Sequence, residues 1–149
     1  MFNDCFGVRQ IGKGGIFDEA GGMRDQLEEL MLKEFQLKQY PLPVEIKVVK
    51  SGGFFLGTKE QCVCITIEEG TAEIYITCTT VGAYLYVGAY VFAASYSDVM
   101  LGSNDVFRLQ RIKAAYSASI QIMEAAFAKL MLKQTDFGYE VERDNIAKT

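Results

Sequence analysis

The stretch QCVCITIEEGTAEIYITCTT, residues 61–80, decides the fold, because it has the pattern of two β-strands joined by a tight turn. Apolar and polar side chains alternate on both sides of Gly70-Thr71, and a period of two is typical of strands. A two-residue loop there, with positive φ at the glycine, suits a type II′ turn. The loop also fixes the register of the apolar partners, which are Ile67 with Ile74, Ile65 with Ile76 and Val63 with Cys78. The stretch therefore predicts an antiparallel hairpin with one face in a core.

The other elements follow from local periodicity. Apolar side chains at three- and four-residue spacing predict a helix at 23–39 and a long helix at 103–130. Alternation predicts strands at 44–50 and 84–94, and a short strand at 54–56. We therefore expect an α+β fold of two layers, in which an antiparallel sheet of four to five strands carries an N-terminal helix and a long C-terminal helix on one face.

The two ends of the chain show weaker patterns. The 149 residues are enough for a single domain, 1–149, with a sizeable core. Glycines interrupt residues 1–20, so we expect an irregular N-terminal arm there. The last eleven residues, 139–149, read YEVERDNIAKT and predict a polar C-terminal tail.

Composition argues against several function classes. The net charge is −4 and no stretch is dense in Lys and Arg, which disfavours nucleic-acid binding. Histidine is absent, which removes the commonest general base and the commonest metal ligand. The longest apolar run is shorter than the roughly 20 residues of a membrane span. We expect no nucleic-acid partner, no membrane partner and no cofactor.

The cysteines indicate a compartment rather than a site. No basic segment followed by an apolar run opens the chain, so we expect a cytoplasmic protein with free thiols. In the predicted hairpin Cys62 and Cys64 point to one face and Cys78 to the other, while Cys5 belongs to an unplaced segment. We therefore expect no metal site.

The long helix suggests self-association. Half of all residues are hydrophobic, and between Lys113 and Lys129 the only charged residue is Glu124. A helix that is apolar over most of its circumference is buried on more than one side. One side belongs to the sheet, and the other requires the first helix or a second copy of the chain. We expect a homo-oligomer, a dimer or higher.

Candidate ligand-binding residues come from three sources. The first is a row of aromatic residues that alternate in the 84–94 strand and so point to one face: Tyr84, Tyr86, Tyr90 and Phe92. Tyr75 of the neighbouring strand would join this row if the two strands align. Such a row stacks on a planar ligand, lines a cavity, or forms a subunit interface or a covered sheet face. Arg9, Lys13 and Lys59 lie in or beside glycine-rich segments and would meet an anion, although flexible arms and turns use the same residues. Glu124 is either a buried acid or a solvated side chain.

No catalytic residue can be assigned from these patterns. We favour a small cytosolic, non-enzymatic binding protein that self-associates and acts through a protein or ligand interface. The alternatives are a protein that binds or sequesters a small molecule (anionic, nucleotide-like or apolar), and a histidine-independent enzyme of unknown reaction.

Overall fold

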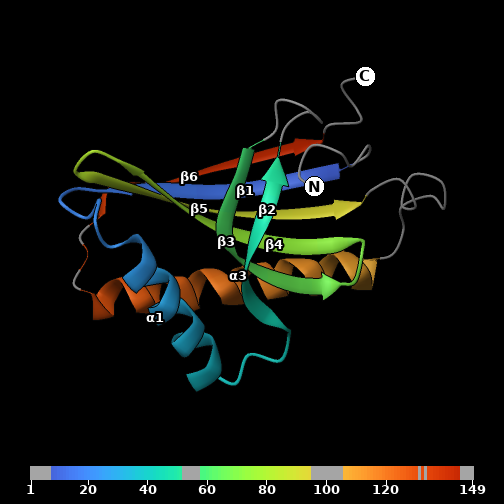
Figure 1. Ribbon diagram of the computed structural model, residues 1–149. Coiled ribbons are helices and arrows are strands. Elements are labelled where there is room, and N and C mark those ends of the chain that lie inside the picture. Colours follow the sequence, from blue (N-terminus) through green and yellow to red (C-terminus); the bar gives the residue numbers. More distant parts are fainter. Residues whose placement is uncertain (1–7, 52–57, 95–105, 131, 133, 145–149) are drawn as a thin grey trace.

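The computed structural model describes residues 8–51, 58–94, 106–130, 132 and 134–144, and side chains within 14–49, 59–92, 106–130 and 132. Within these residues, two helices pack under one antiparallel sheet (Figure 1). The elements follow one another in the order β1 Val8–Phe17, α1 Arg24–Leu37, β2 Val44–Ser51, β3 Thr58–Glu68, β4 Ala72–Val81, β5 Tyr84–Ala94, α3 Val106–Lys129 and β6 Gln134–Asp144.

The sheet has six strands in the order β2-β3-β4-β5-β1-β6, and all its pairs are antiparallel. The predicted α+β class, with both helices on one face of the sheet, is confirmed. The sheet is wider than the four to five strands predicted, because both ends of the chain add a strand. The short strand predicted at 54–56 lies outside the described residues.

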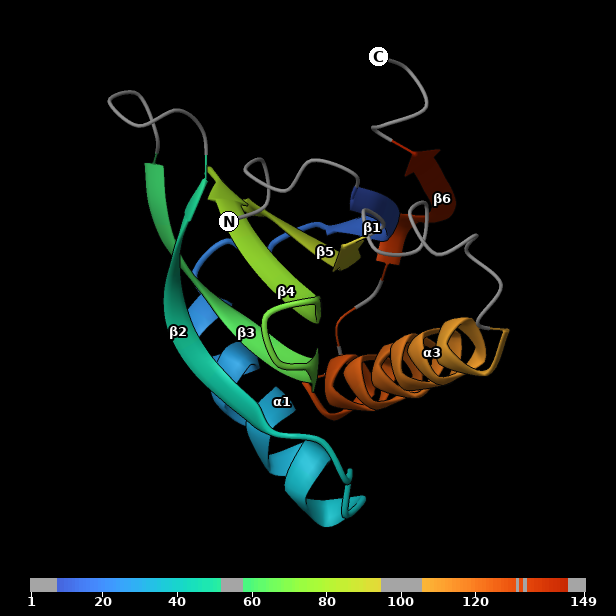
Figure 2. The same ribbon diagram turned by 90° about the vertical axis from the view of Figure 1, so that its right-hand side faces the viewer.

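Both helices lie on the same side of a strongly curved sheet (Figure 2). One parity of each central strand points toward the helices and forms the core with them. This core includes Val63, Ile65, Ile74, Ile76, Leu85, Val87, Ala89, Met31, Leu27, Met123 and Phe127. The Phe17 ring of β1 meets the Phe127 ring of α3 edge to face, with centroids 4.6 Å apart. This contact joins the end of β1 to the C-terminal part of α3.

The second side of α3 is covered by the first helix and the loop after it. Ile122 and Ala126 are buried there, and the Tyr40 hydroxyl donates a hydrogen bond of 2.8 Å to the Ala115 carbonyl. Lys129 forms an ion pair with Glu34 of α1. The sequence left open whether the first helix or a second copy of the chain covers this side of α3. In the structure the first helix covers it, within a single chain.

The β3–β4 hairpin differs from its predicted register by two residues. Ile65 pairs with Ile74 and Val63 with Ile76, because a bulge between Thr66 and Glu68 and a longer loop take up the difference. Gly70 has the expected positive φ of 80°. A positive-φ glycine in a three-residue loop beside a bulge is a common alternative to the two-residue turn. A shift of two leaves every side chain on its predicted face.

The prediction of an irregular arm over residues 1–20 was wrong for residues 8–17, which form the interior strand β1 between β5 and β6. Gly14, one of the glycines that argued against regular structure, has a packing role in this strand. A Cβ atom at Gly14 would lie 2.0 Å from the Tyr86 hydroxyl oxygen of β5. Glycine in a strand can mark such a close approach of a neighbouring group.

The polar tail predicted at 139–149 was wrong for residues 139–144, which belong to the edge strand β6. Tyr139 and Val141 alternate with Glu140 and Glu142, so the segment has a strand period. Charged side chains are common on edge strands because they oppose pairing with other chains. Gly138 is the extra residue where β6 shifts register against β1.

Candidate functional site on the aromatic face of the sheet

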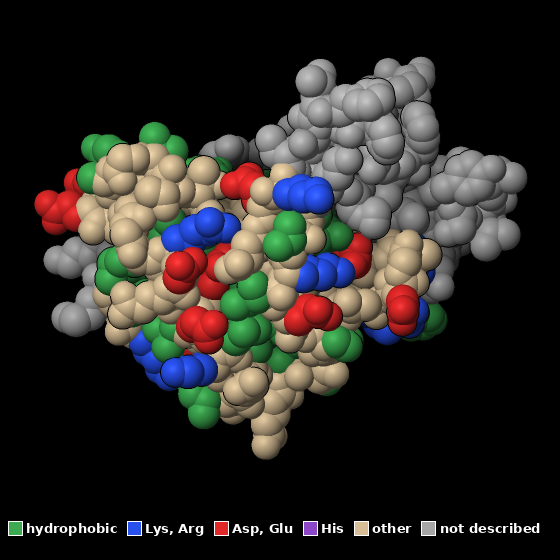
Figure 3. Space-filling model, viewed as in Figure 1, with side chains coloured by type: hydrophobic (Ala, Val, Ile, Leu, Met, Phe, Trp, Pro, Cys, Tyr) green, Lys and Arg blue, Asp and Glu red, His purple; other side chains and the backbone are tan. Residues whose placement is uncertain are grey.

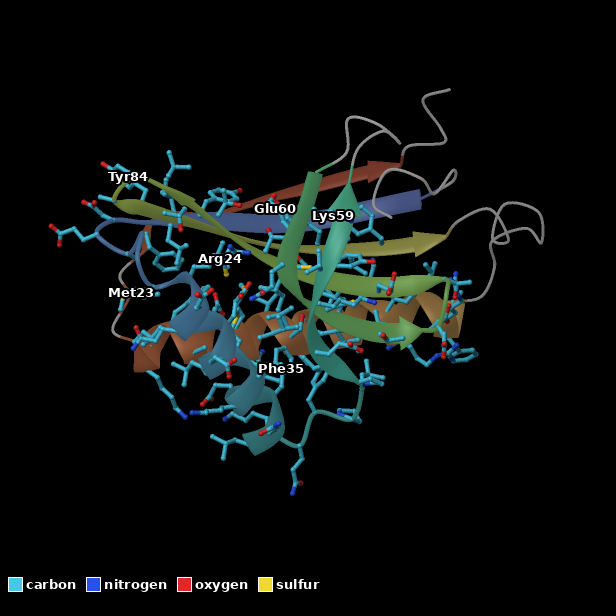
Figure 4. The ribbon with its side chains drawn as sticks, viewed as in Figure 1. Met23, Arg24, Phe35, Lys59, Glu60 and Tyr84 are labelled. Carbon is cyan, nitrogen blue, oxygen red and sulfur yellow. The ribbon has the colours of Figure 1, made fainter. Side chains whose placement is uncertain are left out.

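The face of the sheet away from the helices carries an aromatic layer, which we call the aromatic face: Tyr75, Tyr86, Tyr90 and Phe92. Tyr75 lies opposite Tyr90 in the β4–β5 register, and its ring centroid is 5.7 Å from that of Phe92. The structure therefore brings Tyr75 into the row, as the strand alignment required. Tyr84 is separate, because it lies 44 % exposed at the end of the β4–β5 hairpin (Figure 4).

Two tyrosine rings of the aromatic face lie over glycines. Tyr86 fills the space above Gly14 of β1, and Tyr90 fills the space above Gly88, two residues earlier in its own strand. A Cβ at Gly88 would come within 2.5 to 2.8 Å of the Tyr90 ring and hydroxyl. The rings therefore lie along the sheet and occupy the space that a larger side chain at Gly14 or Gly88 would need.

A polar network borders the aromatic face, with Glu73 at its centre. The Tyr75 hydroxyl donates a 2.6 Å hydrogen bond to Glu73 Oε1, and Cys64 Sγ lies 3.8 Å from Glu73 Oε2. Lys47 of the edge strand β2 places Nζ 3.7 Å from the same Oε2. The carboxylate is therefore shared among three strands and holds the edge strand to the aromatic layer.

The thiols and the phenol of this face keep their protons at neutral pH. Burial raises the pKa of Cys62 to about 12. Burial and the neighbouring Glu73 carboxylate raise the pKa of Cys64 to about 11. Burial and the hydrogen bond to Glu73 also raise the pKa of Tyr75. A thiol that stays protonated is a poor nucleophile, so these groups are suited to packing and hydrogen bonding rather than to covalent chemistry.

The helix side of the sheet holds a buried carboxylate that sequence analysis did not single out. Glu28 of α1 is fully buried and its Oε1 accepts a 2.8 Å hydrogen bond from Gln61 Nε2. Burial, more than any other cause, raises the pKa of Glu28, while Gln61 and Arg24 lower it. Arg24 lies between α1 and the sheet (Figure 4) and donates to the Gln61 carbonyl at 2.9 Å. Nothing in the sequence indicated that Glu28 is buried, because this residue resembles the solvated charges around it.

The other predicted ligand-binding residues belong to β1, β3 and α3. Arg9 and Lys13 lie in β1 opposite Ala93 and Ala89, and their side chains are outside the described part. Lys59 is exposed near the start of β3, well away from Tyr84 (Figure 4). Glu124 is half-exposed on α3. Their proposed ligand contacts stay predictions.

A hollow of about 400 Å³ on the outer side of α3 was not anticipated. Alanines of α3 form its floor, and the loop after α1 forms its wall; the lining residues are Ala118, Gln121, Ile122, Ala125, Lys38, Tyr40 and Pro41. Burial raises the pKa of Tyr40 to about 12, and its hydroxyl stays bonded to Ala115. Only the tertiary approach of the loop to α3 creates the hollow, so local periodicity carries no signal for it.

The cysteine faces agree with the hairpin pattern. Cys62 and Cys64 belong to the aromatic face and Cys78 to the helix-side core, so the three thiols do not converge. Within the described residues no group of three or more Cys, Asp and Glu side chains is arranged to hold a metal ion. Neither α1 nor α3, the described helices, combines the length and the hydrophobicity needed to cross a membrane.

Comparison with known proteins bears on the fold. No protein-family model and no curated protein matches the chain. Among solved structures, it is similar to the open form of the exocytosis-sensitive phosphoprotein pp63/parafusin, a phosphoglucomutase from Paramecium, with a TM-score of 0.50 and 11 % sequence identity. The match covers 90 % of this chain and 22 % of that chain. At this identity the likeness concerns the fold alone.

Proposed function

We propose that this protein is a non-enzymatic binding protein that associates with a second copy of itself and acts through a protein interface. The observation that carries the proposal is that β2 is an edge strand, with no described strand on its outer side (Figure 2). Val48 of this strand is 61 % exposed. An edge strand presents unpaired N–H and C=O groups to which another strand can add.

The internal bonding of the charged groups supports a role without catalysis. Among the described carboxylates, Glu34 is paired with Lys129, Glu68 with Arg108 at 2.8 Å, and Glu73 with Lys47. The three described thiols are buried and protonated. These groups bind strands and helices to one another, which is a structural use. Free buried thiols also fit the reducing cytoplasm, where we place the protein.

A second apolar surface supports action through a protein interface. Val106 and Phe107 begin α3, and Phe107 is 75 % exposed. Phe107 lines a further hollow of about 400 Å³ with Gln110, Arg111 and Ala114. Aromatic side chains beside a hollow are common anchors in protein interfaces.

Sedimentation velocity over roughly 1 to 100 µM protein tests the proposal, because association follows mass action. We expect the sedimentation coefficient to rise from that of a 149-residue monomer to that of a dimer. A monomer throughout this range would overturn the proposal.

A small-molecule function is the second candidate, favoured by the hollow between α3 and the loop after α1. Its floor is apolar, and Lys38 and Gln121 at its lining would suit an amphiphilic anion. A ligand that binds the native state raises the apparent melting temperature. In a thermal-shift screen with fatty acids and nucleotides, a stabilising compound should lose its effect in Ala118→Trp, which fills the hollow. An equal shift in both proteins would exclude this site.

A further inference from the structure

We propose that the second copy adds to the sheet at β2, antiparallel and centred on Ile46, so that Glu45 of each chain faces Lys47 of the other. This inference rests on the proposed self-association and names its surface and register. It follows from three properties of β2: the direction of its backbone groups, the order of its charges and the exposure of Val48.

The direction of the backbone groups follows from one hydrogen bond. The Thr66 N–H donates to the Pro43 carbonyl at 3.1 Å, in the same register that pairs Val44 with Ile65. Hydrogen-bonded and non-hydrogen-bonded pairs alternate along an antiparallel ladder. Glu45 and Lys47 therefore bond to β3, whereas the residues between and beside them point their N–H and C=O groups away from the sheet. These outward-facing residues are Val44, Ile46 and Val48.

The outward-facing residues restrict the register of an added copy. Bonds form only where outward-facing residues of both chains are opposite one another. Centring the pair on Ile46 satisfies this condition and also places Val44 of each chain opposite Val48 of the other. Pro43 does not interfere, because its missing N–H lies on the side of β3.

The charges select the Ile46-centred register from the others that the backbone permits. Moving the centre of the pair by one residue, to Glu45 or to Lys47, places that residue opposite its own copy in the partner chain. Like charges directly opposite one another are destabilising. Centring on Val48 leaves Lys47 opposite Val49 and forms no charge pair. Centring on Ile46 forms two reciprocal Glu45–Lys47 pairs, as an isologous interface requires.

The surroundings of the edge fit this arrangement. Lys47 is 40 % exposed and lies near Glu73 of its own chain, so Glu45 of the partner subunit would approach a cation that one carboxylate already holds in place. Val48, exposed in one chain, gains Val44 of the partner subunit as an apolar neighbour. Figure 3 shows the surface that contains β2 and α1, where acidic, basic and apolar side chains are interspersed. Such an edge is protected from non-matching strands but complementary to itself.

Disulfide trapping tests the register. Residues 45 and 47 of opposite chains form a non-hydrogen-bonded pair with Cα atoms about 4.5 Å apart, which is within the range of a disulfide. In a Cys5→Ser background, an equal mixture of Glu45→Cys and Lys47→Cys chains should yield a covalent dimer on mild oxidation. Each variant alone should yield much less, since neither position is opposite itself. A Lys47→Cys and Val49→Cys mixture is the matched control, because it reports the Val48-centred register.

Charge reversal tests the recognition independently. Glu45→Lys and Lys47→Glu each place like charges opposite one another and should weaken the dimer on the order of tenfold. Mixing the two variants places opposite charges at both pairs and should restore the original affinity as a heterodimer. Circular dichroism of each variant confirms that the chains are folded before mixing.

The outcomes separate the inference from the proposed function. A dimer in sedimentation that gives neither the 45–47 disulfide nor rescue on mixing overturns the β2 register and leaves self-association in place. A disulfide in the 47–49 control mixture in place of the 45–47 mixture overturns the Ile46 centre. A monomer at every concentration overturns both. Restored affinity together with the 45–47 disulfide establishes β2 as the site of self-recognition.

Discussion

The two faces of the sheet are buried by different means. On the helix side, aliphatic side chains from β3, β4 and β5 interlock with α1 and α3, and few polar groups intervene among the described residues, chiefly Glu28, Glu34 and Ser119. On the other side, aromatic rings lie over glycines and a carboxylate shared by three strands fixes their border. Burial of aliphatic area therefore stabilises the first face, while the second adds individual close contacts to the burial of its aromatic rings.

Truncation of Phe127 should show the largest effect. The ring is buried against Phe17 at the end of β1, so Phe127→Ala removes apolar burial and leaves a cavity. We expect the free energy of unfolding to fall by about 3–5 kcal/mol. Leu37→Ala, at the exposed end of α1, is the control and should change it by less than about 0.5 kcal/mol. If urea denaturation showed the same loss of stability for both variants, the core position and the exposed position would not differ as we expect.

A methyl group added to the aromatic face should have the next largest effect. Gly88→Ala places a Cβ within 2.8 Å of the Tyr90 ring, which must move from the sheet. Overpacking of this kind costs about 1–3 kcal/mol. Gly22→Ala meets no atom within 4 Å and is the matched control, with an expected change near zero or slightly stabilising. If both variants unfold at the same denaturant concentration, the rings do not depend on the glycines beneath them.

Removal of one hydroxyl tests the polar border. Tyr75→Phe keeps the buried ring and loses the 2.6 Å hydrogen bond to Glu73. We expect a loss of about 1 kcal/mol, because Glu73 is partly exposed and water can replace the donor. Tyr84→Phe, at the exposed hairpin end, should be neutral. A neutral result for Tyr75→Phe would show that the border contributes no stability of its own.

The central part of the sheet could be predicted because local and tertiary preferences agree there. The alternation of residues 61–80 and 84–94 assigns each side chain to the face on which it is found. The exact partners were not predictable, since a bulge at residue 67 and a longer loop preserve the faces while they shift the register by two.

The strands β1 and β6 could not be predicted because the reasons for them lie in other elements. Gly14 is explained only by Tyr86 of the neighbouring strand, and a local rule treats such a glycine as a breaker of structure. The charges of β6 resemble those of a solvated tail, although they alternate as an edge strand does.

The candidate site was predictable only as a row of aromatic residues. The strand period placed Tyr86, Tyr90 and Phe92 on one face, and the alignment of β4 added Tyr75. The hollow on α3 and the network around Glu73 depend on residues that are distant in sequence, such as Tyr40 with Ala115 and Lys47 with Glu73. Pairings of this kind have no periodic signal.

Glu28, one of the buried polar groups on the helix side, should make the stability of the protein depend on pH. Its folded-state pKa is raised above the ordinary value of 4.5, chiefly by burial. Between the two values the native state binds more protons than the unfolded state, so stability falls as the pH rises through this window. Glu28→Gln removes the titrating group and keeps a side chain of the same shape, so the carboxylates common to both proteins cancel in their difference. The free energy of unfolding of the native sequence, measured relative to Glu28→Gln, should therefore increase as the pH is lowered from 7 toward 4.5. A difference that stays constant, or that changes in the opposite direction, would contradict the raised pKa. It would mean that Gln61 and Arg24 compensate fully for the effect of burial on the Glu28 carboxylate.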